Sequence, residues 1–303
     1  MKHKKLITGF SFILLLLAVW YLFFKKSDYI ITFKTNTSTA TVFQGIQDWY
    51  KARKAIEQET YTLLEKTNFN NLKFTVKTNT ELLEYDWEMK SCNDSVTEVT
   101  IGIKDLNNSL YNRLTVPFGS DFKKKETDKV IDFREGLKNH LKNFKVKLEG
   151  EGKSEAVFVA YINLKSPLQE KAQTMIMNDY IITGYLMKNG IKIIGKPYVE
   201  VVKWDFDNEK LDFNYCFPIE KNTKYIHDEK VKFKTIPAYK GLTATYYGNY
   251  RTSDRAWFAI YDYAQKNGIS LDYKPLEHFM ANPFSGGEEI EWETKIIIPY
   301  AKH

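Results

Sequence analysis

The sequence predicts an α+β protein of three parts: an N-terminal membrane helix, an antiparallel sheet that grips a long helix, and a tandem β-α-β-β domain. Three observations lead to this prediction. Residues 6–24 carry no charge, residues 80–144 pass from alternating to helical periodicity, and one short pattern occurs twice in the C-terminal half. The expected domain boundaries are 1–27, 28–146 and 147–303.

The uncharged stretch 6–24 follows Lys2, Lys4 and Lys5. As an α-helix it would extend about 28 Å, close to the thickness of the hydrocarbon core of a bilayer. A cleaved signal peptide is the competing interpretation, but no small-residue cleavage site follows, and the stretch ends in aromatics and Lys25-Lys26. We therefore expect an uncleaved single-pass anchor, with the larger lysine cluster inside the cytoplasm and the rest of the chain outside it.

The part that follows the anchor is expected to be a separate α+β domain. Residues 29–34 are β-rich, and apolar residues at helical spacing begin at Val42. Between residues 80 and 104 apolar and polar side chains alternate, which predicts an antiparallel hairpin with one buried face. Residues 121–144 then predict a long helix with a single apolar stripe.

The C-terminal half contains an internal duplication. The pattern Tyr-x-x-Lys-Asn-Gly-Ile begins at Tyr185 and again at Tyr263, and in both copies Lys-Pro and a glutamate follow. Each copy lies in a strand-helix-strand-strand unit, so residues 147–220 and 230–303 are expected to be two halves of one domain. The Asn-Gly pairs predict helix ends, because glycine accepts the left-handed conformation found there. We interpret the repeated pattern as structural and not catalytic.

Composition and residue counts exclude several classes of function. The net charge of +6 comes from 44 basic and 38 acidic residues, a mild excess without a concentrated basic face. Because no helix-turn-helix pattern accompanies this charge, nucleic-acid binding is not expected. Two cysteines exclude a disulfide framework and a cysteine metal cluster, and the five histidines have no paired spacing. No glycine-rich phosphate loop occurs, so we expect neither a metal nor another cofactor.

The chain after the first predicted strand resembles a known superfamily. Val42-Phe43 and Asp48-Trp49 resemble the opening of the SRPBCC superfamily, the START and polyketide-cyclase-like binders of lipids and other hydrophobic molecules. The resemblance covers about residues 28–146 and implies a helix-grip fold. Because this copy is short, the enclosed cavity of that family is expected to be reduced or filled by side chains.

A second resemblance covers residues 145–303, which look like the GyrI-like, AraC-type bacterial effector-binding domain. The matching features are Gly195-x-Pro197-Tyr198, Gly248-x-Tyr250, Trp257, Asn282-Pro283, and Trp292-Glu293-Thr294 before Pro299. The resemblance implies a tandem of strand-helix-strand-strand units around a ligand cleft. It also implies that this cleft admits drug-like, often cationic molecules, which stack on aromatic side chains and meet a buried glutamate.

This sequence departs from that family at two positions. Lys295 occupies the place where the family usually has its acid, and Glu293 points in the same direction. A buried lysine would shift the preference toward anionic or carbonyl ligands, or Glu293 would neutralise it. Hydrolases of the family use a glutamate and a tyrosine, and the tyrosine expected two residues after Glu277 is Phe279, which implies that this machinery is absent.

The candidate site residues come from strand periodicity and from the resemblance. Tyr215 and Phe217 share one face of the last strand of the first repeat, and that apolar face is expected to pack beneath a helix. The partly polar opposite faces are expected to meet water or to border a cleft. The candidate ligand-binding residues are Lys295, Glu293, Asn214, Tyr198, Tyr247, Trp257 and Phe279.

These observations leave three hypotheses of function. The first is a membrane-anchored, non-catalytic binder of a small hydrophobic or amphipathic molecule in the cleft of the C-terminal domain. The alternatives are a hydrolase that uses Glu293 in the same cleft, and a structural or partner-binding envelope protein whose pockets are filled. Transcriptional regulation, the usual setting of the effector-binding domain, is disfavoured because the N-terminal part contains no DNA-binding motif.

Overall fold

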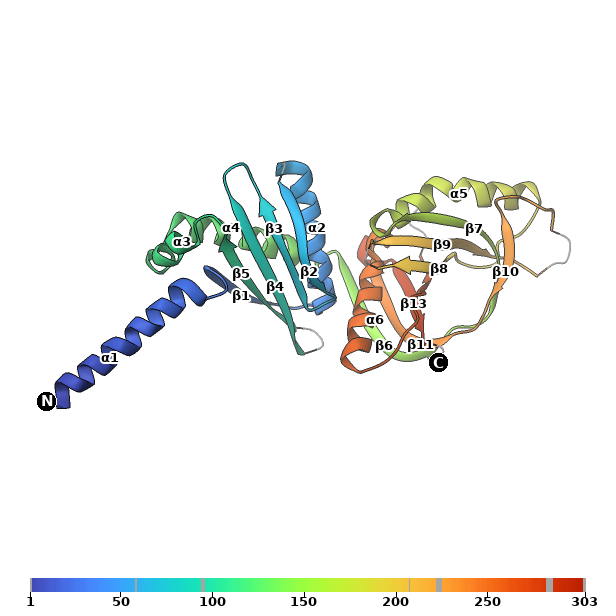
Figure 1. Ribbon diagram of the computed structural model, residues 1–303. Helices are drawn as coiled ribbons and strands as arrows, with labels where there is room; N and C mark the ends of the chain where they lie inside the picture. The colour runs from blue at the N-terminus through green and yellow to red at the C-terminus, as the bar shows by residue number, and fades with distance from the viewer. Residues whose placement is uncertain are drawn as a thin grey trace. The chain divides into compact units, whose positions relative to one another are not determined.

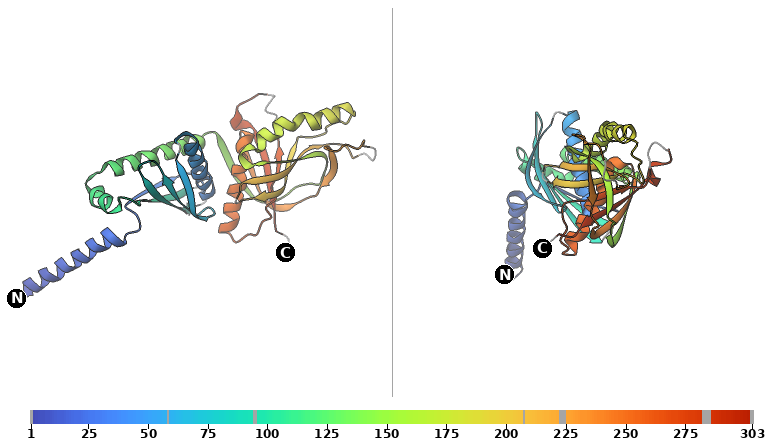
Figure 2. Two further views of the ribbon diagram at one scale, coloured as in Figure 1. Left: turned by 45° about the horizontal axis from the view of Figure 1, so that its top comes forward. Right: turned by 90° about the vertical axis from the view of Figure 1, so that its right-hand side faces the viewer.

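A computed structural model describes residues 2–57, 59–93, 96–206, 208–221, 225–281 and 286–301 of the protein. The chain divides into two compact units, Met1–Asn139 and His140–His303. Each unit contains one antiparallel sheet with helices packed on it (Figure 1, Figure 2). The α+β class predicted from the sequence is therefore confirmed.

The N-terminal unit contains a five-stranded sheet in the order β1-β5-β4-β3-β2. Its strands are β1 (Tyr29–Thr35), β2 (Thr60–Thr67), β3 (Asn71–Lys77), β4 (Leu82–Asn93) and β5 (Val96–Asp105). The predicted hairpin is confirmed as β4 and β5, which pair antiparallel along most of their length. The side chains on the apolar face of β4 are buried as the alternation predicts: Leu83, Tyr85, Trp87 and Met89.

Helices α2 (Thr39–Glu57) and α4 (Asp121–His140) pack on this apolar face. Between β5 and α4 lie the shorter helix α3 (Ser109–Thr115) and the 3-10 helix η2 (Val116–Phe118). Phe133 of α4 contacts both Trp87 of the sheet and Trp49 of α2, with ring centroids 5.1 and 5.6 Å apart. The helix predicted over residues 121–144 ends four residues earlier, at His140. Phe144 therefore belongs to the next strand and not to the helix.

The predicted N-terminal membrane helix is wrong. Among the described residues, every helix is too short or too polar to cross a membrane. Helix α1 (Lys2–Val19) includes the lysines of the N-terminal cluster, and at Trp20 the backbone changes to a π-helix, η1 (Trp20–Phe24). The regular helix that follows Lys5 is therefore about 21 Å long, well below a bilayer core of about 30 Å. The single-pass location expected for residues 6–24 is corrected with it, and the expected membrane partner is not shown.

Arg113 of α3 binds the backbone at the C-terminal end of η1. Its guanidinium donates to the carbonyl oxygens of Leu22 and Lys25 at 2.8 and 2.6 Å, and to Asp28 Oδ1 at 2.7 Å. The ion pair is buried, because the Arg113 side chain is 3% exposed and that of Asp28 is 0% exposed. Carbonyl groups at the end of a helix lack donors within the helix, and the guanidinium of Arg113 supplies these donors.

The C-terminal unit contains an eight-stranded sheet. Its elements are β6 (Phe144–Lys153), β7 (Val157–Pro167), α5 (Lys171–Lys188), β8 (Tyr198–Asp205), β9 (Lys210–Pro218), β10 (Lys232–Ile236), β11 (Lys240–Gly248), the 3-10 helix η4 (Tyr250–Thr252), α6 (Asp254–Lys266), β12 (Leu276–Phe279) and β13 (Glu293–Pro299). The strand order is β10-β7-β9-β8-β12-β13-β11-β6. The order β7-β9-β8 of the first repeat is thus mirrored by β12-β13-β11 of the second, and the repeats meet where β8 pairs with β12.

The repeated Asn-Gly pairs end the two helices in the same way. After α5, Gly190 has a φ of 62°, and after α6, Gly268 has a φ of 66°. The next amide donates back to the carbonyl of the final turn in both cases, from Ile191 to Leu186 and from Ile269 to Ala264, each at 2.9 Å. This is the Schellman arrangement, which needs a residue in the left-handed region. The prediction that these pairs are helix ends is confirmed.

Two glycines of this region allow a matched test of the helix end. A Cβ atom at Gly184, inside α5, or at Gly190 would meet no atom within 4 Å, so the two positions differ mainly in backbone conformation. We expect Gly190→Ala to destabilise the protein by about 1–2 kcal/mol, because alanine is strained at positive φ. Gly184→Ala should stabilise it by about 0.5–1 kcal/mol, because alanine is the better helix former. Urea denaturation measures both, and equal effects at the two positions would contradict the assignment.

Candidate functional site

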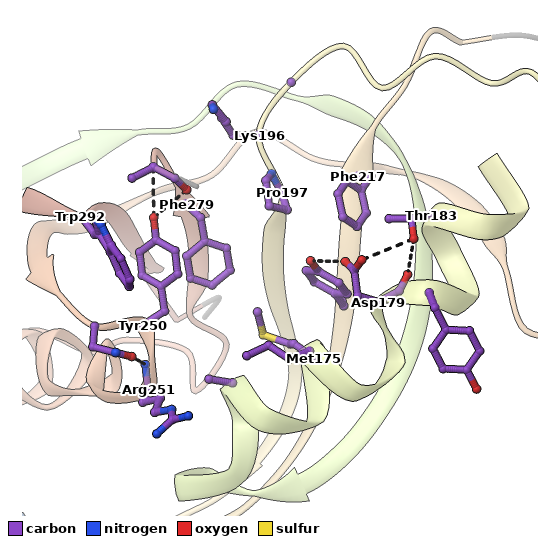
Figure 3. Close-up of a pocket in the computed structure, with 17 residues that line it drawn as sticks. Met175, Asp179, Thr183, Lys196, Pro197, Phe217, Tyr250, Arg251, Phe279 and Trp292 are labelled. Atoms are coloured by element: carbon purple, nitrogen blue, oxygen red, sulfur yellow. Dashed lines mark hydrogen bonds between the residues drawn. The ribbon is translucent and has the colours of Figure 1, made fainter. Parts of the chain in front are cut away.

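A cavity of about 650 Å³ lies under α5 in the C-terminal unit (Figure 3). The side of α5 that borders it carries residues three and four apart, including Ala172, Met175, Asp179 and Thr183, as expected for one face of a helix. Tyr180 of α5 is one of six aromatic residues in the lining. The other five come from outside this helix and are Tyr215, Phe217, Tyr250, Phe279 and Trp292.

The aromatic end of the cavity is fixed by packing and by hydrogen bonds around Tyr250. Its ring centroid lies 4.5 Å from that of Phe279 and 5.8 Å from that of Trp292. The Tyr250 hydroxyl donates to the carbonyl oxygen of Ala281 at 2.8 Å and accepts from the amide of the same residue at 3.1 Å. Burial raises the pKa of Tyr250 to about 12, so this ring presents a neutral, apolar face. The wall is therefore suited to stacking against a planar apolar group.

The opposite end of the cavity holds one carboxylate, Asp179. Its Oδ1 accepts a hydrogen bond from the Tyr215 hydroxyl at 2.9 Å, whereas the Thr183 hydroxyl donates to the backbone carbonyl of Asp179 at 2.8 Å and lies 3.4 Å from Oδ2. Burial, and next the charge of Asp179, raise the pKa of Tyr215, which keeps the hydroxyl protonated as a donor. Within the described part of the chain, no lysine or arginine forms an ion pair with Asp179, and its partners are neutral hydroxyl groups. The two basic residues of the lining, Lys196 and Arg251, are exposed.

A buried ion pair lies directly behind the aromatic wall. Lys171, the first residue of α5, donates to the two carboxylate oxygens of Glu277 at 2.8 and 2.7 Å, and the two side chains are 1% and 0% exposed. Glu277 precedes Phe279 by two residues on β12, so both side chains point to the helix side of the sheet. The same ammonium group donates to Ser253 Oγ at 2.8 Å and lies 4.4 Å from the centre of the Trp257 ring.

Of the seven predicted ligand-binding residues, only Phe279 lines this cavity. Trp257 is fully buried and contacts Lys171 instead. Asn214 and Tyr198 lie on the other face of the sheet, where Asn214 donates to Glu200 Oε2 at 2.7 Å. Tyr198 stacks on His278, with ring centroids 3.9 Å apart. Burial, with a smaller contribution from Lys295, lowers the pKa of His278 to about 4.

The other three predicted residues also lie away from the cavity. Lys295 is exposed on β13 and forms no ion pair with Glu293, which is half-buried. In the β11–β13 register Glu293 lies opposite Tyr247, and Lys295 lies opposite Thr245. The face of the sheet that these residues share with Asn214 carries a buried cluster of Val159, Cys216, Ile236, Leu276 and Ile297.

The sequence patterns missed two polar residues that the structure places in or behind the cavity, Lys171 and Asp179, and they named Glu277 only as the position two residues before Phe279. One signal for Asp179 was present, because it is a charged residue within a run of apolar residues of α5, between Met175 and Ile182. The partner of Lys171 lies 106 residues away in sequence, so no local pattern could have paired them. Asn282-Pro283, two of the residues that carried the family resemblance, lie outside the described residues.

Residues 155–301 match the family model of the GyrI-like small molecule binding domain. The predicted GyrI-like domain is confirmed by this match, and the predicted SRPBCC-like domain before it stays a prediction. None of the curated proteins matches the chain.

Three solved structures to which the chain is similar have low sequence identity. The EcmrR C-terminal domain is 18% identical, with 53% of this chain and 99% of that chain covered and a TM-score of 0.45. A hydrolase from Listeria innocua is 10% identical over 50% of this chain and 92% of its own, with a TM-score of 0.34. The di-domain ARO/CYC protein StfQ is 9% identical over 90% of this chain and 85% of its own, with a TM-score of 0.26.

Proposed function

Because residues 155–301 form a GyrI-like small-molecule-binding domain, we propose that the protein binds a small hydrophobic or amphipathic molecule in the cavity under α5. The observation that carries the proposal is the cavity itself, with its volume of about 650 Å³ and its largely aromatic wall. Ligand sites of proteins commonly have volumes of about 300–1,000 Å³, with mainly apolar walls and a few polar groups that fix orientation.

The two ends of the cavity indicate the shape and polarity of the ligand. Tyr250, Phe279 and Trp292 offer ring surfaces for an apolar or aromatic body. Asp179 offers an acceptor, and its Oδ1 is already oriented by the Tyr215 hydroxyl. A molecule with an apolar ring system at one end and a hydrogen-bond donor at the other would satisfy both ends, which describes an amphipathic ligand.

We propose binding without catalysis, because Phe279 stands two residues after Glu277, where the resemblance implies that a hydrolase would carry a tyrosine, and the Glu277 carboxylate is paired with Lys171. The hydrolase alternative relied on Glu293, which lies on the other face of the sheet, opposite Tyr247. Binding by the cavity remains the function that the geometry supports best.

Phe279→Ala tests the proposal with Nile red, a neutral aromatic dye whose fluorescence rises in an apolar site. We expect the wild-type protein to bind the dye and the variant to bind it about tenfold more weakly, because the variant loses a ring of the cavity wall. Fluorescence titration measures both dissociation constants, and circular dichroism confirms that the variant is folded.

Tyr198→Ala is the matched control, because Tyr198 was also a predicted ligand residue but lies on the opposite face of the sheet. It should leave dye binding unchanged. A wild-type protein that does not bind the dye, or a loss in Tyr198→Ala as large as that in Phe279→Ala, would overturn the assignment of the cavity.

A further inference from the structure

The ammonium group of Lys171 is held as a bound cation would be held. Its three N–H donors have three acceptors within hydrogen-bond distance, the two Glu277 oxygens at 2.8 and 2.7 Å and Ser253 Oγ at 2.8 Å. The centre of the Trp257 ring lies 4.4 Å away, which is within the range of a cation–π contact. Carboxylate, hydroxyl and ring face together form a cation cage, made of Glu277, Ser253 and Trp257.

The cation cage is built from the same elements as the cavity wall. Glu277 and Phe279 are two residues apart on β12, and Lys171 precedes the lining residue Ala172 on α5. Ser253 Oγ donates to the carbonyl oxygen of Tyr250, a second lining residue, at 3.0 Å. The cage therefore lies close to the aromatic pair Tyr250 and Phe279 of the cavity wall, whose ring centroids are 4.5 Å apart.

We infer that Lys171 is a tethered occupant of a binding site for primary alkylammonium ions, and that its presence closes this site to cationic ligands. The inference rests on the proposed function, because it concerns which ligand charge the domain accepts. Lys171 neutralises the Glu277 carboxylate behind the wall, and Asp179 is the carboxylate among the described residues that line the cavity. Lys171 is thus a specificity-determining residue that acts by occupying the site, and not by contact with the ligand in the cavity.

Chemical rescue with n-propylammonium tests this inference. Lys171→Ala removes the lysine side chain beyond Cβ, and n-propylammonium has the same three carbons and one nitrogen. We expect the amine to raise the Tm of Lys171→Ala by about 3 to 6 °C when its free concentration is about ten times Kd. Where Lys171→Ala is unfolded without the amine, the same titration is followed as recovery of the far-UV circular dichroism of the folded protein.

Three controls define the expected pattern. The Tm of the wild-type protein should not rise with the amine, because its cage is filled. The Tm of Lys171→Ala/Glu277→Gln should also not rise with the amine, because its cage has lost the negative charge. 1-Propanol, a neutral molecule of similar shape, should have no comparable effect on Lys171→Ala.

The inference is overturned if n-propylammonium does not rescue Lys171→Ala, or if 1-propanol or the double variant gives an equal gain. Nile red binding by the wild-type protein is measured in parallel, and it reports on the cavity alone. Absence of dye binding with successful rescue would contradict the proposed function and leave the cation cage standing. Dye binding without rescue would contradict the cage and leave the cavity standing.

Discussion

Replacement of Lys171 by methionine is expected to lower the free energy of unfolding by about 3–5 kcal/mol. Methionine fills most of the volume of the lysine methylene groups, but it removes the ammonium group whose Nζ lies 2.7 Å from Glu277 Oε2. The Glu277 side chain is 0% exposed, so its carboxylate is left buried without a counter-charge. An unpaired buried charge has lost its hydration without gaining a counter-charge, and this is what destabilises the variant. Urea denaturation followed by tryptophan fluorescence measures the loss from the shift in midpoint.

A double variant separates the charge effect from packing. Lys171→Met/Glu277→Gln removes both charges of the pair, so it should regain at least about half of the loss of the single variant. Lys188→Met is the matched control, since Lys188 is an exposed lysine of the same helix and should change stability by less than about 0.5 kcal/mol. A loss in Lys171→Met no larger than in Lys188→Met, or a double variant as unstable as the sum of the single variants, would contradict the pair.

Local patterns predicted the β4–β5 hairpin and helix α4, each of which has one buried and one exposed face. Trp87 and its neighbours on β4 alternate with charged residues, and β4 is half-buried as that alternation requires. The Asn-Gly pairs predicted the ends of α5 and α6 because only the backbone conformation matters there. Strand β2 was not predicted, because it is the edge strand of the sheet and its side chains are largely exposed, which removes the alternation. Strand β3 was not predicted either, although its buried residues alternate over seven positions.

The candidate site was predicted less well, because its position depends on which face of the sheet is filled. Period two correctly separated Tyr215 and Phe217 from Asn214 and Cys216 on β9, but it does not say which set borders a cavity. Packing decides this. Ile236 of β10 completes a core on the side of Cys216, whereas α5 leaves space above Tyr215 and Phe217. The position of β10 beside β7 at one edge of the sheet depends on long-range pairing, which no local pattern contains.

The uncharged stretch 6–24 shows a different limit of sequence patterns. Hydropathy alone does not indicate the residue at which a regular α-helix ends. Helix α1 gives way to the π-helical turn η1 at Trp20, and the carbonyl groups of that turn are bound by an arginine about 90 residues later. Arg113 therefore has a structural role that the hydropathy of residues 6–24 does not reveal. It joins the end of the N-terminal helix to the sheet domain through two carbonyl groups and the Asp28 carboxylate.

Arg113→Met is accordingly expected to destabilise the N-terminal unit by about 3 kcal/mol or more and to release the N-terminal helix. Asp28 would keep the Ser109 hydroxyl at 2.5 Å and the Asp105 amide at 2.9 Å, but it would lose its counter-charge. Urea denaturation measures stability, and limited trypsin digestion measures release, because Lys25 and Lys26 follow η1 directly.

Two further variants sharpen this test of the arginine. Arg113→Lys should recover only part of the stability, because one ammonium group cannot span the three acceptors that the planar guanidinium reaches at once. Arg134→Met removes an exposed arginine of α4 and should change stability by less than about 0.5 kcal/mol. Full recovery by lysine would show that charge alone matters at this position. Unchanged trypsin cleavage in Arg113→Met would show that the helix is held by contacts other than this arginine.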